Sequence, residues 1–242
     1  MSELAATEPE LGTSRWWAER EHRLLRRRPR SDGLTIERIV ATALALIDSE
    51  GLDTLTVRRL AEELSTGSAS LYRHVSSRDE LLVLVVDHVL GEIELPSVGL
   101  TGRAKVEWLS TELRRVLIAH PMLLPALAAS PLVGPNALRG ARNGLGNLIE
   151  AGYAPETAVP AYLAMIDYVL GTVYFDTSRA GQDSTMLPLH GEGFVRPSAA
   201  QVFQFGLRTF LDGLAVRFPV TSATNIIAAQ AGSGGSQIAP TA

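Results

Sequence analysis

Two short apolar stripes separated by a polar turn form the clearest pattern in this chain. The first stripe repeats at the spacing of one helix face and consists of Val57, Leu60, Ala61 and Leu64. Thr56 precedes it and can cap a helix by accepting a hydrogen bond from a backbone N–H of the first turn. Leu71 and Val75 form the second stripe, at positions i and i+4. The pattern predicts two short helices, the second over about residues 68–74, packed on one small core.

The second of these helices presents hydrogen-bonding side chains of mixed length and no acid. The outward positions are Ser68, Ser70, Tyr72, Arg73 and His74. A short helix with such a face suits insertion into the DNA major groove, where base edges offer donors and acceptors. The alternative is a pair of helices that only packs, because many helix-turn-helix pairs bind nothing.

Helical spacing continues on both sides of this pair. An apolar stripe predicts a helix from Thr35, which caps it, to Glu50. A helix from Arg78 toward Pro96 is expected to act as a lever into the rest of the chain. From Arg103 onward the sequence is rich in Ala and Leu, and we find no convincing strand run. The helices expected there span residues 103–120, 122–129, 135–151, 155–178 and 197–218.

These elements predict an all-α fold with two domains. An N-terminal three-helix domain with a helix-turn-helix is expected over residues 34–82, with the lever helix continuing to about residue 95. A C-terminal helical domain is expected over residues 103–218. Within it, the polar loop Thr177–Arg196 is long enough to be either functional or disordered. Residues 1–33 and 219–242 are expected to be a disordered basic arm and a disordered tail.

The N-terminal arm owes its basic character to arginines. They are Arg15, Arg20, Arg23, Arg26, Arg27, Arg28 and Arg30. The arm either follows the DNA backbone or enters the minor groove, or it is a solvated tail without such a role. Trp16 and Trp17 lie at its start, where they either cap a short helix or contact a partner subunit.

Composition narrows the function without naming it. The 242 residues carry a net charge of -4, so any basic surface for nucleic acid must be local. The lack of cysteine excludes disulfides and thiol catalysis and fits a reducing cytoplasm. We find no apolar run of membrane-spanning length and no signal-peptide core. We therefore expect a cytoplasmic protein without a membrane partner.

Enzyme chemistry finds little support in the sequence. It contains no phosphate-cradling glycine loop of the nucleotide-binding kind and no nucleophile elbow. The histidines are scattered without ligand spacing, at His22, His74, His88, His120 and His190. We therefore expect no catalytic residue, no metal ion and no cofactor.

Three blocks of sequence, in fixed order and spacing, carry a resemblance to a known family. They read Leu-Thr-Val-Arg-Arg-Leu-Ala (55–61), Leu-Tyr-Arg-His-Val (71–75) and Ser-Ser-Arg-Asp-Glu-Leu-Leu (76–82). The run from Leu34 to Leu82 thereby resembles the DNA-binding domain of the TetR family of bacterial transcriptional repressors. The resemblance implies that Tyr72, His74 and Arg78 hold phosphates. It leaves four candidates for base specificity, namely Arg58, Ser68, Ser70 and Arg73.

The turn departs from the family pattern. The family usually has Leu-Gly-Val where this chain has Leu64-Ser65-Thr66. Either Ser65 takes the backbone angles that glycine normally takes there, or Gly67 has taken over that position. The two possibilities would orient the recognition helix differently.

The resemblance extends into the C-terminal domain of the tetracycline-repressor-like branch. The similar segments are residues 113–121, 152–158, 168–171 and 205–214. The resemblance implies a homodimer, in which the last two long helices form a four-helix bundle with the partner. Gly171, Gly206 and Gly213 would allow those helices to approach closely, unless they serve only packing within one subunit. A dimer also supplies the two reading heads that a twofold operator requires.

The same branch implies an effector pocket in this domain. Candidate lining residues are Trp108, His120, Met122, Asn143, Tyr162, Met165 and Tyr168. Each of them, taken singly, also has a core-packing interpretation. Together they suggest an apolar effector with few polar contacts.

The magnesium chemistry of the tetracycline repressor does not carry over. Paired from His120, that repressor's metal-binding histidine falls on Leu127, and a partner acid falls at or next to Phe175. Leucine cannot ligate Mg²⁺, which takes oxygen or water-bridged ligands. We therefore expect an effector other than tetracycline.

The sequence thus predicts a homodimeric regulator that binds double-stranded operator DNA. We expect a repressor that a small apolar effector releases from the operator. The rival from another class is a helical small-molecule-binding protein or enzyme whose helix-turn-helix is only structural.

Overall fold

A computed structural model describes residues 9–25, 34–97, 99–178, 186–189, 192–195 and 197–219. The chain forms two compact units. The first unit combines residues 1–94 with 111–142 and 170–181, and the second combines residues 95–110 with 143–169 and 182–242. The predicted all-α architecture is confirmed, apart from one short hairpin.

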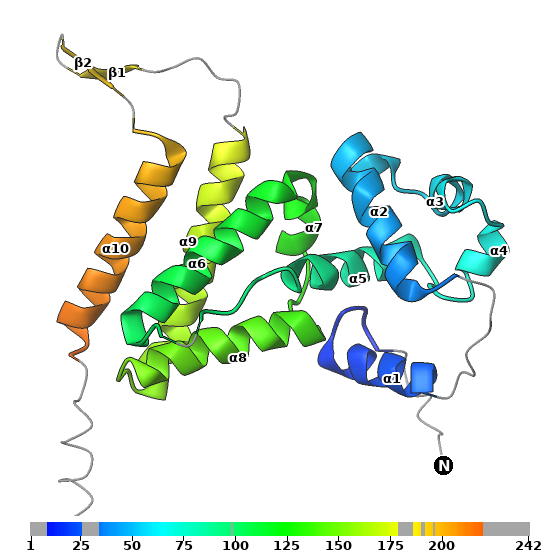
Figure 1. Cartoon of the computed structure of the whole chain (residues 1–242), viewed down its shortest axis with the longest axis horizontal. Helices are drawn as coiled ribbons and strands as arrows, with labels where there is room; N and C mark the ends of the chain where they lie inside the picture. Colours follow the sequence, from blue (N-terminus) through cyan, green and yellow to red (C-terminus); the bar gives the residue numbers. More distant parts are fainter. Residues whose placement is uncertain are drawn as a thin grey trace, which may run out of the picture. The chain divides into compact units, whose positions relative to one another are not determined.

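The first unit contains the predicted helix-turn-helix (Figure 1). Its elements are α2 (Ile36–Glu50), the 3-10 turn η1 (Leu52–Thr54), α3 (Val57–Glu63), α4 (Ser68–Leu71) and α5 (Arg78–Leu90). Their inward side chains make one small core, in which Ile39, Ile47, Leu60 and Leu71 are fully buried. Thr35, Thr56 and Ser77 cap α2, α3 and α5 through their hydroxyl oxygens.

A helix precedes this domain, in the arm where a short helix at the tryptophans was one of two alternatives. Helix α1 spans Ser14–Leu25, so the expectation of a disordered arm is wrong for these residues. Trp16 is only 4% exposed and Arg20 only 6%, which shows that the helix is packed against the protein. The many arginines had predicted a solvated segment. One of them, Arg20, is instead buried by the packing of this helix. The later arginines of the predicted arm lie outside the described residues.

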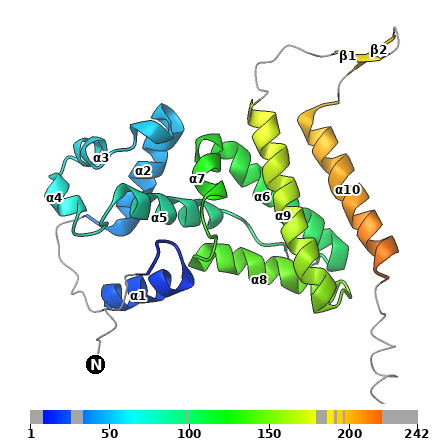
Figure 2. The same ribbon diagram turned by 180° about the vertical axis from the view of Figure 1, so that it is seen from behind.

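The remaining helices begin and end close to where the periodicity predicted. They are α6 (Gly102–Ala119), η2 (Pro121–Leu123), α7 (Leu124–Ala128), α8 (Pro135–Glu150), α9 (Pro155–Ser178) and α10 (Ala199–Arg217). Ser198 and Gln201 form a reciprocal capping box at the start of α10, which fixes that boundary. Within the second unit α10 lies beside α9 (Figure 2), where Tyr168 stacks on Phe203 at 5.7 Å between ring centroids.

The predicted loop between α9 and α10 contains a hairpin, which corrects the expectation of no strand. Strands β1 (Met186–Leu189) and β2 (Glu192–Val195) pair antiparallel, with Met186 opposite Val195. Each strand is four residues long and contains a residue that disfavours strands, Pro188 or Gly193. No alternation of apolar and polar residues therefore marks them in the sequence.

Helix α9 also corrects the expectation that no apolar run reaches membrane-spanning length. It has 24 residues and an 18-residue window of mean hydropathy 1.4, which suffices by length and composition. Core helices of soluble proteins pass the same test. The α9 residues Ala158, Ala161, Met165 and Val169 are buried against the protein.

Candidate nucleic-acid interface

The turn of the helix-turn-helix adopts one of the two conformations that the sequence left open. Ser65 has a φ of 51°, in the left-handed region. Gly67 has a φ of -83° and a ψ of 145°, which any residue can adopt. The turn is closed by the Thr66 N–H, which donates to the Ala61 carbonyl at 2.9 Å. Ser65 therefore takes the place of the glycine that the family uses.

The recognition helix α4 is shorter than predicted. Helical geometry ends at Leu71, and residues 72–74 continue as turns, in which the His74 N–H donates to the Leu71 carbonyl at 2.8 Å. Leu71 and Val75 are 0% and 2% exposed, so both ends of the segment are anchored in the core. The anchors orient the polar side chains between them.

The predicted contact residues of α4 and the following turn remain accessible to different degrees. The Tyr72 side chain is 55% exposed. Arg73 is exposed and donates from Nη2 to the Ser70 hydroxyl at 2.9 Å. Ser68, Ser70 and His74 are half-buried. The segment Ser68–Val75 therefore offers hydroxyl, phenol, guanidinium and imidazole groups without a carboxylate.

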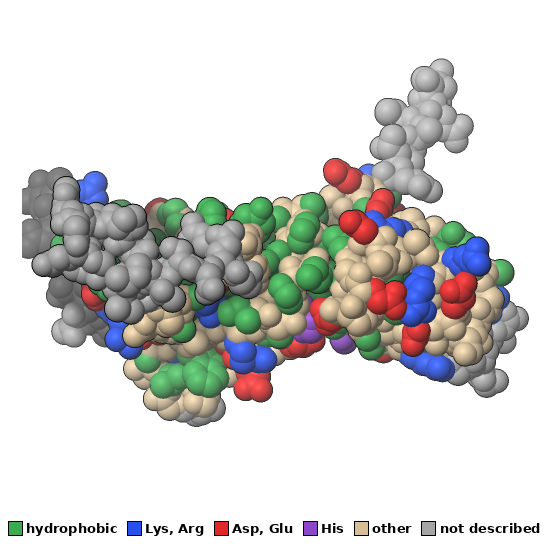
Figure 3. Space-filling model, turned by 90° about the horizontal axis from the view of Figure 1, so that it is seen from above, with side chains coloured by type: hydrophobic (Ala, Val, Ile, Leu, Met, Phe, Trp, Pro, Cys, Tyr) green, Lys and Arg blue, Asp and Glu red, His purple; other side chains and the backbone are tan. Residues whose placement is uncertain are grey.

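Helix α3 contributes arginines that are already paired with acids. The Arg58 side chain is 88% exposed and lies 3.0 Å from the Glu62 carboxylate. Arg59 pairs with Glu50 and Glu63, which raise the pKa of its guanidinium. Figure 3 shows acidic and basic side chains side by side over this unit. An exposed pair one turn apart is weak, so Arg58 can exchange Glu62 for a phosphate or guanine at little cost.

Arg78 does not lie as a phosphate clamp would. Its Nε donates to the Leu55 carbonyl and its Nη2 to the Leu52 carbonyl, both at 2.8 Å. The guanidinium thereby fixes the backbone of η1, directly before α3. The resemblance to the family implied that Arg78 contacts DNA. Its hydrogen bonds in the structure favour a role in positioning the backbone before α3.

The candidate effector residues are divided between the two units. His120 and Met122 belong to the first unit, and Trp108, Asn143, Tyr162, Met165 and Tyr168 belong to the second. Met165 is 3% exposed, whereas Trp108 is 41% exposed and Met122 50%. The Tyr168 hydroxyl donates to the Phe203 carbonyl at 2.9 Å, and burial raises the pKa of Tyr162. Met165 and Tyr168 thus follow the core-packing interpretation.

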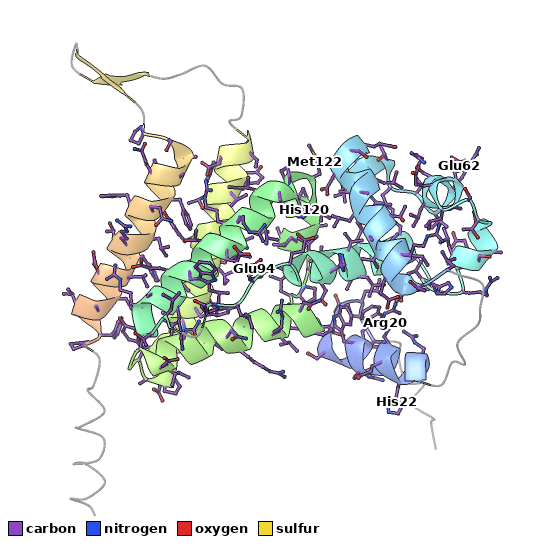
Figure 4. The ribbon with its side chains drawn as sticks, viewed as in Figure 1. Arg20, His22, Glu62, Glu94, His120 and Met122 are labelled. Atoms are coloured by element: carbon purple, nitrogen blue, oxygen red, sulfur yellow. The ribbon has the colours of Figure 1, made fainter. Side chains whose placement is uncertain are left out.

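His120 is engaged within the protein rather than free for an effector. Its Nδ1 lies 2.8 Å from an Asp48 carboxylate oxygen, and its Nε2 lies 3.1 Å from one of Glu92. The side chain is only 13% exposed. Figure 4 shows His120 close to the end of α6. It joins the end of α6 to the ends of α2 and α5, so the effector role predicted for it has no support here.

The C-terminal end of α5 is held by further polar contacts in the same unit. Arg139 on α8 donates to the carbonyls of Gly91 and Ile93, at 2.9 and 3.2 Å. The Glu112 carboxylate on α6 accepts from the Glu94 N–H at 3.2 Å. Arg115 and that N–H hold the pKa of Glu112 below its usual range. Helices α6 and α8 thereby hold the backbone that directly follows α5, the lever helix.

Asp87 forms a further polar contact between α5 and α8. Its carboxylate accepts hydrogen bonds from the backbone N–H groups of Asn136 and Ala137, in the first turn of α8. A carboxylate at a helix N-terminus also interacts favourably with the helix dipole. A small, solvent-open hollow adjoins this cap and is lined in part by Trp17, Asp87 and Gly134. None of the seven predicted effector residues lines it.

Within the second unit, α9 and α10 leave large apolar side chains uncovered. On α10, Phe205 is 74% exposed, Val216 82% and Val202 50%. On α9, Val159 is 46% exposed and Leu163 56%. Exposed apolar side chains gathered on neighbouring helices are typical of a protein–protein interface.

No metal site is built by the described residues, among which no three His, Asp or Glu side chains cluster as ligands would. Leu127, at the position that pairs with a metal-binding histidine, is 2% exposed within the first unit. It serves as a core residue there.

Comparison with known proteins finds two family matches. Residues 39–85 match the family described as bacterial regulatory proteins, tetR family. Residues 95–191 match the tetracyclin repressor-like C-terminal domain. The first match contains α3, α4 and the start of α5, and it ends where the lever helix continues.

Two curated relatives are regulators of transcription. An HTH-type transcriptional regulator from Saccharopolyspora erythraea is 37% identical over 151 residues, which are 62% of this chain and 64% of the relative. The HTH-type transcriptional repressor DrrR1 from Streptomyces coeruleorubidus is 37% identical over 140 residues, 57% of this chain and 52% of the relative. The matches thus span less than two thirds of these relatives' lengths.

Two solved structures share the fold over nearly their full length. The Streptomyces coelicolor TetR family protein ActR, in complex with actinorhodin, has a TM-score of 0.66 at 33% identity, covering 76% of this chain and 97% of ActR. BioQ with its double-stranded DNA operator has a TM-score of 0.59 at 27% identity, covering 76% of this chain and 99% of BioQ.

Proposed function

Because this chain belongs to the TetR family of bacterial transcriptional regulators, we propose that it binds operator DNA as a homodimer and represses transcription until a small molecule releases it. The observation that carries the proposal is the segment Ser68–Val75, whose anchored, acid-free polar side chains suit the major groove. BioQ, a structural relative, is solved with its DNA operator. DrrR1, a sequence relative, is named a repressor.

The exposed apolar side chains of α9 and α10 support a homodimer. Phe205 and Val216 would lose most of their exposed surface against a second copy, which is favourable in proportion to the apolar area covered. Dimerisation through this face pairs two reading heads with the two halves of a twofold operator.

Effector release requires that a change in one domain reach the reading heads. The contacts of Arg139, Glu112 and His120 at the exit of α5 supply a physical connection, because they tie that helix to α6 and α8. An effector that moves α6 or α8 would move α5 with it. ActR is solved with actinorhodin, an example of a small-molecule ligand in a relative. The effector of this chain is proposed to be a small apolar molecule other than tetracycline.

We propose that the protein is a regulator and not an enzyme, and that it acts in the cytoplasm, where operator DNA lies. The rival is a helical small-molecule-binding protein or enzyme with a structural helix-turn-helix. The accessible Tyr72 and Arg58 favour DNA binding over that rival, because a purely structural pair has no need to expose them.

Fluorescence anisotropy on labelled DNA from the intergenic region beside its own gene tests the proposal. We expect tight binding that resists competitor DNA and weakens with salt, and a loss of at least tenfold for Tyr72→Ala. Arg58→Ala should also lower the slope of log K against log salt by about 1 if it contacts a phosphate. Arg142→Ala, an exposed arginine of α8, is the matched control.

Equal, weak binding by the native chain, Tyr72→Ala and Arg142→Ala would overturn the DNA-binding proposal. It would favour the ligand-binding rival, which predicts no role for the exposed side chain of Tyr72.

A further inference from the structure

Helix α1 reaches the helix-turn-helix through a buried ion pair. Arg20 on α1 lies 3.0 Å from Glu80 on α5, and the two side chains are 7% and 5% exposed. Figure 4 shows Arg20 directed from α1 toward α5. A buried pair of this kind is unlike the exposed pairs on α3, because neither charge can be solvated if the other is removed.

Glu80 connects this pair to the recognition segment. Its second carboxylate oxygen accepts hydrogen bonds from the backbone N–H and the hydroxyl of Ser76, the N–H at 2.7 Å. Ser76 directly follows Val75, the last anchor of the recognition segment, and Ser77 caps α5. Arg20 therefore acts on the junction between α4 and α5 through one carboxylate.

Two tryptophans fix α1 beside α5. Trp16 is buried, and the Arg20 guanidinium lies 5.8 Å from the centre of its ring. Trp17 lines the hollow next to Val83 and Asp87 of α5. The helix is therefore packed by aromatic side chains and aligned by a charge. It lies outside the residues that match the family, 39–85 and 95–191.

We propose that α1 is part of the DNA-reading unit and that Arg20 is a positioning residue for the recognition helix. It holds the Glu80 carboxylate in the position where it accepts from Ser76, and so sets the angle between α4 and α5. Arg20 itself does not contact DNA. The inference rests on the proposed DNA-binding function and adds an element to it.

The test compares operator binding by the native chain, Arg20→Met and Arg15→Met. Arg15 is the matched control, since it is an arginine of the same helix in an exposed pair with Glu19. We expect Arg20→Met to bind operator at least tenfold more weakly at every salt concentration, with an unchanged slope of log K against log salt. Arg15→Met should bind as the native chain does.

A second variant separates positioning from simple stabilisation. In Arg20→Met/Glu80→Leu an apolar pair replaces the buried charges, which is expected to restore the thermal midpoint. It also removes the carboxylate that accepts from Ser76, so operator affinity should stay at the low level of Arg20→Met. Recovery of full affinity together with the midpoint would overturn the positioning role.

The outcomes also separate this inference from the proposed function. If the native chain and Arg15→Met bind specifically and Arg20→Met binds equally well, only the role of Arg20 fails. If the native chain shows no specific binding, the proposed function fails and this inference with it. A fall in the salt slope of Arg20→Met would instead mean a direct phosphate contact and would also contradict it.

Discussion

Ser65 and Gly67 lie two residues apart in the turn, and the serine rather than the glycine has the positive φ, 51° against -83°. A left-handed residue with a Cβ costs about 1–2 kcal/mol, whereas glycine adopts that region freely. The turn is therefore strained at Ser65, whereas Gly67 has a conformation that any residue can adopt.

Ser65→Gly should leave the protein equally or more stable, by up to about 1 kcal/mol, because relief of strain offsets the larger entropy of the unfolded chain. Ser65→Val should destabilise it by at least about 1 kcal/mol, since a β-branched residue fits this region poorly. Urea denaturation checks both. If the valine variant were as stable as the native chain, the assigned turn conformation would be wrong.

Gly134→Ala should destabilise the first unit by about 1–3 kcal/mol, the usual cost of overpacking. An added Cβ would overlap the carboxylate of Asp87, which caps α8, and the ring of Trp17. Gly140→Ala on α8 is the control, because its Cβ would meet nothing within 4 Å and alanine favours a helix. Thermal melts distinguish the two, and equal midpoints would contradict the packing of α1 at this site.

Glu112→Gln should lower stability at neutral pH by about 1 kcal/mol, through loss of charge-assisted hydrogen bonds. The folded-state pKa of Glu112 is lowered by Arg115, so its contribution is present above the unfolded pKa and is lost as the pH falls through the folded one. The native chain should thus lose more stability than Glu112→Gln on acidification below about pH 4. Denaturation curves at pH 7, 5 and 3 measure this, and parallel losses would exclude it.

His120 and Asp48 should show a coupling energy of about 0.5–3 kcal/mol in a double-mutant cycle. The cycle combines His120→Ala with Asp48→Asn, and the expectation follows from the 2.8 Å contact between the two side chains. A second cycle with Glu92→Gln covers the other ring nitrogen. Strict additivity in both cycles would show that the imidazole does not join these helices.

Phe205→Asp should convert the dimer to monomers and abolish tight operator binding while leaving the helical content unchanged. A charge on an apolar interface loses its water without gaining a partner. Sedimentation velocity measures the mass, with Leu95→Asp as a control at an exposed apolar residue that belongs to neither α9 nor α10. A dimeric Phe205→Asp protein would place the interface elsewhere.

Periodicity and caps were sufficient for most helix positions. Helix α9 begins and ends where Pro155 and the polar residues after Ser178 predicted, and Thr56 caps α3 as expected. These features are local, so each can be predicted from residues that are neighbours in the sequence.

The functions of single charged residues were less predictable, because their partners are distant in sequence. Arg78 finds two carbonyl acceptors 23 and 26 residues away, and Arg20 finds Glu80 across 60 residues. Neither partner has a sequence signal, so one arginine was expected on DNA and the other in a disordered arm. A pattern of apolar residues cannot identify an arginine that is buried by pairing.

The brevity of α4 has a consequence for how the operator is read. Four helical residues close few backbone hydrogen bonds, so the amides of Ser68–Leu71 are held by their anchors rather than by their own helix. They will exchange with solvent through small local openings, whereas the amides of the buried face of α5 exchange only when the whole unit unfolds. Binding DNA must then suppress those openings, which costs conformational entropy. In a longer helix that entropy would already be lost on folding, before DNA binds.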